Sequence, residues 1–153
     1  MGMKAATAVW DGHGLAFDVT VPSGATLRLD SEGVNFRALE MLMVGLAGCT
    51  GMDVIDILRK KRQRVTGFEV QTRGETAEDH PKKYTHIEVK YVVTGEGIDP
   101  EAVRRAIELS ETKYCAVINT LRAAAPIHTS FEIREVEAVP AGARAIDLAG
   151  RLG

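Results

Sequence analysis

The chain has 153 residues, of which 45% are hydrophobic and 26% charged, with a formal net charge of −2 and a pI near 6.1. This composition is typical of a single compact globular domain and excludes a disordered chain. The balanced charge gives no general attraction to phosphate or anionic lipid, and the basic run at 59–62 is local, so neither nucleic acid nor a membrane is expected as a partner.

No run of about 18 consecutive apolar residues is present, and the N-terminus lacks the charged and apolar regions of a secretory signal. We therefore expect a cytoplasmic protein. In that compartment two cysteines would be kept reduced, and a disulfide between them would be transient and catalytic.

The first thirty residues predict an antiparallel meander. Apolar side chains alternate with polar or small ones, as half-buried strands require, at Leu15, Phe17, Val19 and Val21 and again at Ala25, Leu27 and Leu29. Residues 11–14 and 22–24 supply glycine-containing turns between these strands.

A long helix is predicted from about Arg37 to Gln63, because this stretch contains no proline and residues 38–48 are almost continuously apolar. Such a helix would be covered on nearly every side. At about 1.5 Å per residue it would be roughly 39 Å long, longer than one domain of this size covers with its own core, so a partner subunit is expected to cover the rest. Glycines weaken it, and a break between Gly48 and Gly51 would place Cys49 at a new helix N-terminus.

The second half of the chain predicts two further strands, at 68–73 and 86–93, connected by the polar segment 74–83. Asp99 and Pro100 are typical of a helix N-cap and first helical position. The polar stretch 110–113 divides the following helix into two, and Pro126 ends it before a last strand at 127–136. We predict an α+β fold with one domain at 1–137 and a C-terminal tail at 138–153.

Cys49 and Cys115 are separated by 66 positions, with no CxxC motif and no histidine within a turn of either. The spacing therefore does not predict a metal site. From the residues alone two interpretations stay open: each cysteine is a buried small hydrophobe, or the two form a reactive thiol pair.

Three segments taken together resemble the OsmC/Ohr family, the osmotically inducible and organic hydroperoxide resistance proteins. They are EMLMVGLAGCTGMDVIDIL at 40–58, YTHIEV at 84–89 and LSETKYCAV at 109–117, and the resemblance extends from about Lys4 to Val136. It implies an OsmC-like α+β fold in which two chains intertwine as a homodimer, with N-terminal antiparallel strands, a long buried central helix, two further strands, a helix pair and a last strand.

The resemblance also implies a thiol peroxidase that acts on organic hydroperoxides. Cys49 would attack the peroxide and become a sulfenic acid, and Cys115 would resolve it to a Cys49–Cys115 disulfide. A dithiol or a lipoylated protein would reduce the bridge, and no cofactor would be needed.

The chain departs from the best-characterised members, which carry an arginine in the first hairpin turn, where this chain has His13, and a glutamate at the position of Leu39. Glu40 comes one residue later, which rotates its side chain by about 100°. The sequence is therefore similar to a less-characterised OsmC-like branch, in which Glu40 and Arg37 are candidates to activate or orient the thiolate. Equally, Glu40 can be a first-turn carboxylate that the helix dipole favours and Arg37 a solvated side chain.

Two other functions remain open. The protein could be a weakly catalytic or non-catalytic relative that binds an apolar ligand at the dimer interface, or an obligate structural dimer without a ligand. Tyr114 and the methionines Met41, Met43 and Met52 are expected to line the core or a pocket, which would favour fatty or aromatic hydroperoxides.

Overall fold

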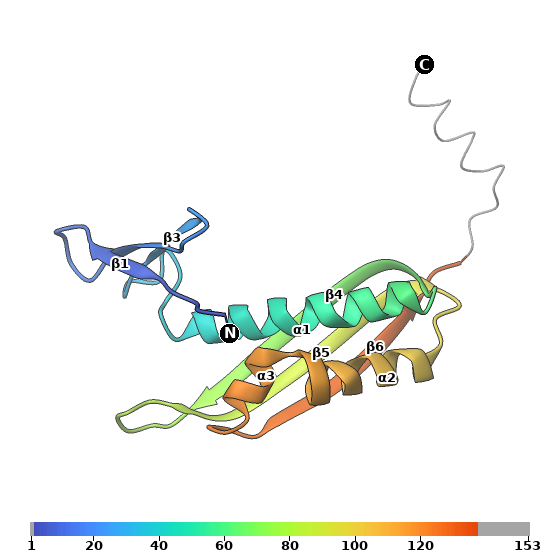
Figure 1. The fold of residues 1–153 in the computed structure, drawn as a ribbon. Coiled ribbons are helices and arrows are strands. Elements are labelled where there is room, and N and C mark those ends of the chain that lie inside the picture. Colours follow the sequence, from blue (N-terminus) through green and yellow to red (C-terminus); the bar gives the residue numbers. More distant parts are fainter. Residues whose placement is uncertain (1, 138–153) are drawn as a thin grey trace, which may run out of the picture. The chain divides into compact units, whose positions relative to one another are not determined.

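The computed structural model describes residues 2–137, so the predicted tail at 138–153 lies outside the described residues. The chain divides into two compact units, Met1–Gly45 and Leu46–Gly153. The predicted single domain at 1–137 stays a prediction. Figure 1 shows the order of the elements.

The first unit contains a three-stranded antiparallel sheet of β1 (Thr7–Trp10), β2 (Phe17–Thr20) and β3 (Thr26–Leu29), in the order β1-β2-β3. The predicted meander is confirmed. Glycines at positive φ, Gly12 at 91° and Gly24 at 87°, lie in the two connecting turns, where a side chain would be strained. Arg28 on β3 also stabilises this sheet, because its guanidinium forms ion pairs with Asp18 at 2.9 Å and with Asp11.

The second unit is built on a sheet of β4 (Arg64–Thr76), β5 (Tyr84–Glu96) and β6 (Ile127–Glu135), in the order β4-β5-β6. β4 and β5 pair antiparallel, whereas β5 and β6 pair parallel. The parallel pair requires a crossover, which α2 (Pro100–Leu109), a π-helical turn η1 (Ser110–Tyr114) and α3 (Ala116–Leu121) provide. α1 (Glu40–Lys60) begins in the first unit, and Figure 1 shows α1 and α2 on the same face of the sheet.

Helices and sheet meet in one core. On α1 every fourth residue is fully buried, which places Leu46, Thr50, Val54 and Leu58 in one stripe along the helix. Alternate residues of the central strand β5 face this stripe and the buried side chains of α2, as the period of a strand requires: Ile87, Val89, Tyr91 and Val93. This mixed α+β architecture is the predicted fold class.

α1 is continuous through its glycines, so the expected break between Gly48 and Gly51 is wrong. Each glycine weakens a helix by roughly 0.5–1 kcal/mol, but the buried stripe contributes more than this cost. Gly51 is also where α1 comes close to β4: a Cβ built there would lie 3.2 Å from Cγ2 of Val70. The small side chain thus allows the helix to pack against the strand.

The rest of α1 is far less covered than the sequence predicted. Leu42 is 43% exposed, Val44 46% and Met52 68%. Within one chain the helix is therefore not covered on nearly every side, because the chain itself buries only the single stripe. By length and composition alone α1 would also qualify as a membrane span, a test that core helices of soluble proteins pass as well.

The second helical segment agrees with its predicted signals. Asp99 caps α2 by accepting a hydrogen bond from the N–H of Glu101 at 3.0 Å, and Pro100 is the first helical residue. The polar stretch divides the segment as expected, since α2 ends at Leu109 and η1 follows from Ser110 to Tyr114.

Candidate functional site

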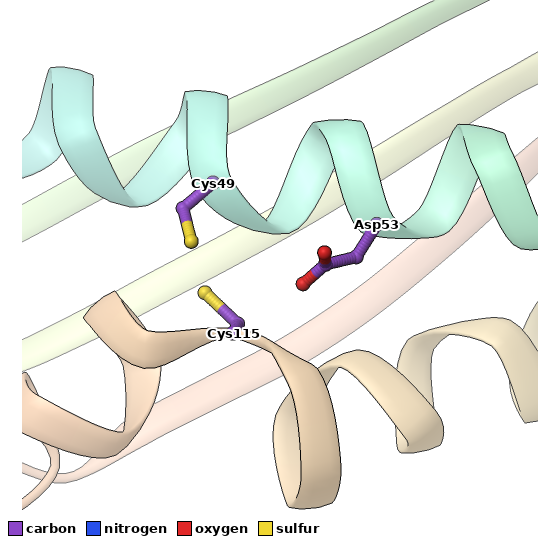
Figure 2. Close-up of side chains that lie close together, drawn as sticks. All are labelled: Cys49, Asp53 and Cys115. Carbon is purple, nitrogen blue, oxygen red and sulfur yellow. The ribbon is translucent and has the colours of Figure 1, made fainter. Parts of the chain in front are cut away.

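The fold brings the two cysteines together. Cys49 lies in the middle of α1 and Cys115 between η1 and α3, and both are free thiols. The two sulfurs and a carboxylate oxygen of Asp53 all lie within 4.8 Å of one another. Figure 2 shows the three side chains pointing toward one another from the two facing segments. An S–S bond of about 2.05 Å would thus require the sulfurs to approach by less than about 3 Å.

Local structure sets the direction of each side chain. Cys49 and Asp53 are four residues apart on one helix, so they lie on the same face. The N–H of Cys115 donates to the carbonyl of Ser110 at 2.8 Å, which closes the π-helical turn, and the backbone of Cys115 is then extended. The Cys115 sulfur accepts the N–H of Ile118 at 3.3 Å as the N-cap of α3. Hence Cys115, rather than Cys49, lies at a helix N-terminus.

Cys115 is fully buried, whereas Cys49 is partly exposed. Burial raises the pKa of the Cys115 thiol to about 11, the N–H of Ile118 opposes this shift, and the neighbouring Cys49 adds to it. At neutral pH Cys115 is therefore a protonated thiol. Of these two residues, Cys49 is therefore the one that is partly accessible from solution.

A chain of buried hydroxyl groups ends at Asp53. Ser110 Oγ donates to Asp53 Oδ2 at 3.1 Å, Thr50 Oγ1 lies 2.9 Å from Ser110 Oγ, and Tyr91 Oη lies 2.6 Å from Thr50 Oγ1. Each hydroxyl carries one hydrogen, and that of Ser110 goes to the carboxylate. Thr50 therefore donates to Ser110 and Tyr91 donates to Thr50, so all three bonds point toward Asp53.

No motif in the sequence predicted a role for Asp53, Ser110, Thr50 or Tyr91. The spacing of Cys49 and Asp53 on one predicted helix was the available signal, because residues four apart share a face. The hydroxyl chain had no such signal: Thr50 and Ser110 are 60 positions apart, and Thr50 and Tyr91 are 41 apart. Only the packing of α1 against β5 and η1 brings these groups together.

Within residues 2–137, the Cys49, Asp53 and Cys115 side chains form the one group of three or more potential metal donors. A closed tetrahedral zinc site uses four protein donors, and this group offers three, one of them on a fully buried thiol that is protonated at neutral pH. We therefore interpret the cluster as a thiol site, and the prediction that no metal is required stays a prediction.

Arg37 and Glu40 belong to the first unit and Cys49 to the second, so their predicted action on the thiol stays a prediction. The Glu40 carboxylate accepts a hydrogen bond from the backbone N–H of Arg37 at 3.0 Å, the geometry of a carboxylate that stabilises a helix start. His13, the residue in the first hairpin turn, is 92% exposed, with Nδ1 4.0 Å from Asp11.

We expect the reduced protein to lose stability as the pH rises through about 9 to 12. Burial raises the pKa of Tyr91 to about 12 and that of Cys115 to about 11. Between the ordinary and the raised pKa the unfolded chain has lost these protons while the folded chain keeps them, so higher pH favours unfolding. Urea midpoints at pH 8 and 11 measure this loss. Tyr91→Phe removes the contribution of the phenol, so the stability of this variant should fall less between the two pH values. A loss of stability as large as that of the wild type would show that Tyr91 does not contribute.

Comparison with known proteins identifies the family of proteins to which this chain belongs. The model of the OsmC-like protein family matches residues 31–130. Protein YhfA of Escherichia coli K12 is 40% identical over 123 residues, which cover 79% of this chain and 92% of YhfA. The chain belongs to the OsmC family.

Solved structures agree with this membership. A hypothetical protein from Aquifex aeolicus is 31% identical, with a TM-score of 0.80, and the match covers 90% of this chain and all of that one. The organic hydroperoxide resistance protein OhrB of Bacillus subtilis has the same fold, with a TM-score of 0.59 at 15% identity, over 86% of this chain and 98% of that one. The predicted OsmC-like fold is confirmed.

Proposed function

We propose that the protein is a thiol-dependent peroxidase that reduces organic hydroperoxides. The observation that carries the proposal is the approach of Cys49 and Cys115 to within 4.8 Å, in a family that includes organic hydroperoxide resistance proteins. Cys49 is the attacking residue, because it is the sulfur that is partly exposed, and the buried Cys115 is the resolving one.

The reaction uses both sulfurs of the pair. The Cys49 thiolate attacks one peroxide oxygen, an S–O bond forms as the O–O bond breaks, and the alkoxide leaves as an alcohol after taking up a proton. The Cys115 sulfur then attacks the sulfenic acid, forming the S–S bond and releasing water. A dithiol, free or carried as a lipoyl group on a protein, returns both thiols by exchange.

The proposal is tested by whether a hydroperoxide forms the Cys49–Cys115 disulfide. One equivalent of cumene hydroperoxide added to the reduced protein is expected to yield a Cys49–Cys115 disulfide, seen by peptide mass spectrometry as a cross-link that a dithiol removes. Consumption of the peroxide should match the disulfide formed. If the peroxide persists beside two free thiols, the peroxidase proposal is wrong, and the alternative of a non-catalytic relative that binds an apolar ligand becomes the better one.

We also propose that the protein is a cytoplasmic homodimer in which a second copy covers apolar side chains that α1 leaves exposed. The side chains that support this are Leu42, Val44 and Met52, which one chain leaves 43–68% exposed although they are apolar. A closed symmetric dimer is the commonest way for a soluble protein to bury such a surface.

Sedimentation is expected to give particles of twice the 16.6 kDa chain mass. Met52→Glu should shift them toward monomers, because a carboxylate at a buried interface is costly, whereas Lys82→Glu in the β4–β5 loop should not. Monomers in the wild type would contradict the homodimer, and recovery of the protein with the membrane fraction would contradict the cytoplasmic location.

A further inference from the structure

Asp53 lies beside both thiols, although the proposed attack of Cys49 on the peroxide gives it no part. One oxygen of its carboxylate is within 4.8 Å of the sulfurs of Cys49 and Cys115, and Figure 2 shows it directed into the space between α1 and the Cys115 segment. Oδ2 of the same carboxylate accepts a hydrogen bond from Ser110 Oγ at 3.1 Å, at the end of the hydroxyl chain. A carboxylate in this position places a negative charge next to two sulfurs, which calls for a physical reason.

The resolving step gives a physical reason for the position of this carboxylate. Cys115 can attack the sulfur of Cys49 only as a thiolate. Its thiol is fully buried, and burial holds its pKa near 11, so at neutral pH almost none of it is ionised. The backbone N–H of Ile118, 3.3 Å from the sulfur, stabilises the thiolate once it forms but takes up no proton. The step needs a proton acceptor within reach of a buried sulfur.

We propose that Asp53 is the general base of the resolving step. Its carboxylate takes the proton of the Cys115 thiol as that sulfur attacks Cys49 and the S–S bond forms. The S–O bond of the sulfenic acid breaks, and the departing hydroxide takes the proton back from Asp53 and leaves as water. This inference rests on the proposed redox pairing of the two cysteines, and it adds a catalytic residue to it.

The hydroxyl chain fits this role. Its three hydrogen bonds all run toward the carboxylate, from Tyr91 through Thr50 and Ser110 to Asp53. Such a chain holds the side chain in one orientation. The carboxylate of Asp53 can therefore accept the proton without first having to turn toward the sulfur.

Other titratable groups around Asp53 are placed less well for this proton. Tyr91 on β5 is held neutral by its burial and donates into the chain. On η1, the charge of Glu111 helps to raise the pKa of Tyr91. The Lys113 ammonium lies over the ring of Tyr114, 5.3 Å from its centroid. On α1, Asp56 is paired with Lys60 at 2.5 Å, on the exposed side of the helix.

The proton transfer can be measured without any peroxide. Dithiodipyridine reacts with the accessible Cys49 and releases one thiopyridone; Cys115 then attacks the mixed disulfide, passes its proton to the base and releases the second. The two releases are followed by absorbance in a stopped-flow instrument, with the intact protein, from about pH 7 to 9. The second release reports the Cys115 step alone, so its result is independent of whether the protein reduces hydroperoxides.

In Asp53→Asn we expect the second release to slow by about 100-fold at neutral pH, the usual effect of losing a general base. Its rate should then rise about tenfold per pH unit, because Cys115 must ionise to bulk solvent, whereas the wild-type rate should change little over this range. Asn keeps the shape of the side chain and can still accept from Ser110. Asp56→Asn, on the same helix, is the matched control and should behave as wild type.

A rate in Asp53→Asn that equals the wild-type rate would overturn the proposal. So would a rate that is lower by the same factor at every pH, since this would mean that Asp53 only positions the thiols. Ser110→Ala provides a second variant that keeps the carboxylate: it should slow the second release by less than Asp53→Asn and leave the pH profile flat. A steep profile in Ser110→Ala would assign the proton to the hydroxyl chain and not to Asp53.

Discussion

Cys49→Ser is expected to abolish the reduction of organic hydroperoxides, with a loss of at least about 1000-fold in kcat/KM, because a serine hydroxyl is not ionised at neutral pH and does not attack the O–O bond. In the proposed reaction the attacking residue is the partly exposed cysteine of the pair. The other cysteine in residues 2–137, Cys115, is fully buried and cannot replace it from the solvent side. The measurement is the turnover of cumene hydroperoxide with a dithiol as reductant.

Serine differs from cysteine by one atom, and residue 49 is only partly buried, so the fold should persist; the thermal midpoint checks this. Cys115→Ser is the matched control for the first step, since it keeps the attacking thiol and should still consume one equivalent of peroxide. Equal turnover in Cys49→Ser and the wild type would show that peroxide reduction does not pass through Cys49.

Cys115→Ser is expected to have the second largest effect, at least about a 100-fold loss of steady-state turnover. A thiol held next to the sulfenic acid reacts at an effective concentration far above that of an external dithiol, and the variant loses this advantage. The sulfenic acid then persists, and further peroxide converts it to a sulfinic acid. Mass spectrometry of Cys49 should show two added oxygens in the variant and a disulfide in the wild type.

The serine can still cap α3, since its hydroxyl oxygen can accept the Ile118 N–H that the sulfur accepts now. A change in turnover can thus be assigned to lost resolution and not to a lost helix cap. A dimedone adduct on Cys49 that forms in the variant and not in the wild type would support this order of events. Wild-type turnover in the variant, with no over-oxidation, would remove Cys115 from the reaction.

Much of the fold follows from local patterns. Alternating apolar residues fixed the strands around Phe17, Leu27 and Tyr91, and Asp99 with Pro100 fixed the start of α2, because these signals depend on neighbours a few residues away. The expected helix break at Gly48 failed for the same reason: the local cost of glycine was counted, whereas the packing of α1 on the sheet could not be.

The sequence by itself determined the elements, their order, and a family resemblance that made Cys49 and Cys115 the candidate pair. Tertiary structure alone decided that the two sulfurs come close together, that Cys115 rather than Cys49 caps a helix, and that Asp53 lies beside them at the end of a hydroxyl chain from Tyr91. The reason is physical: contacts between residues 41 to 66 positions apart depend on how a helix packs on a sheet, and no periodicity along the chain encodes that distance.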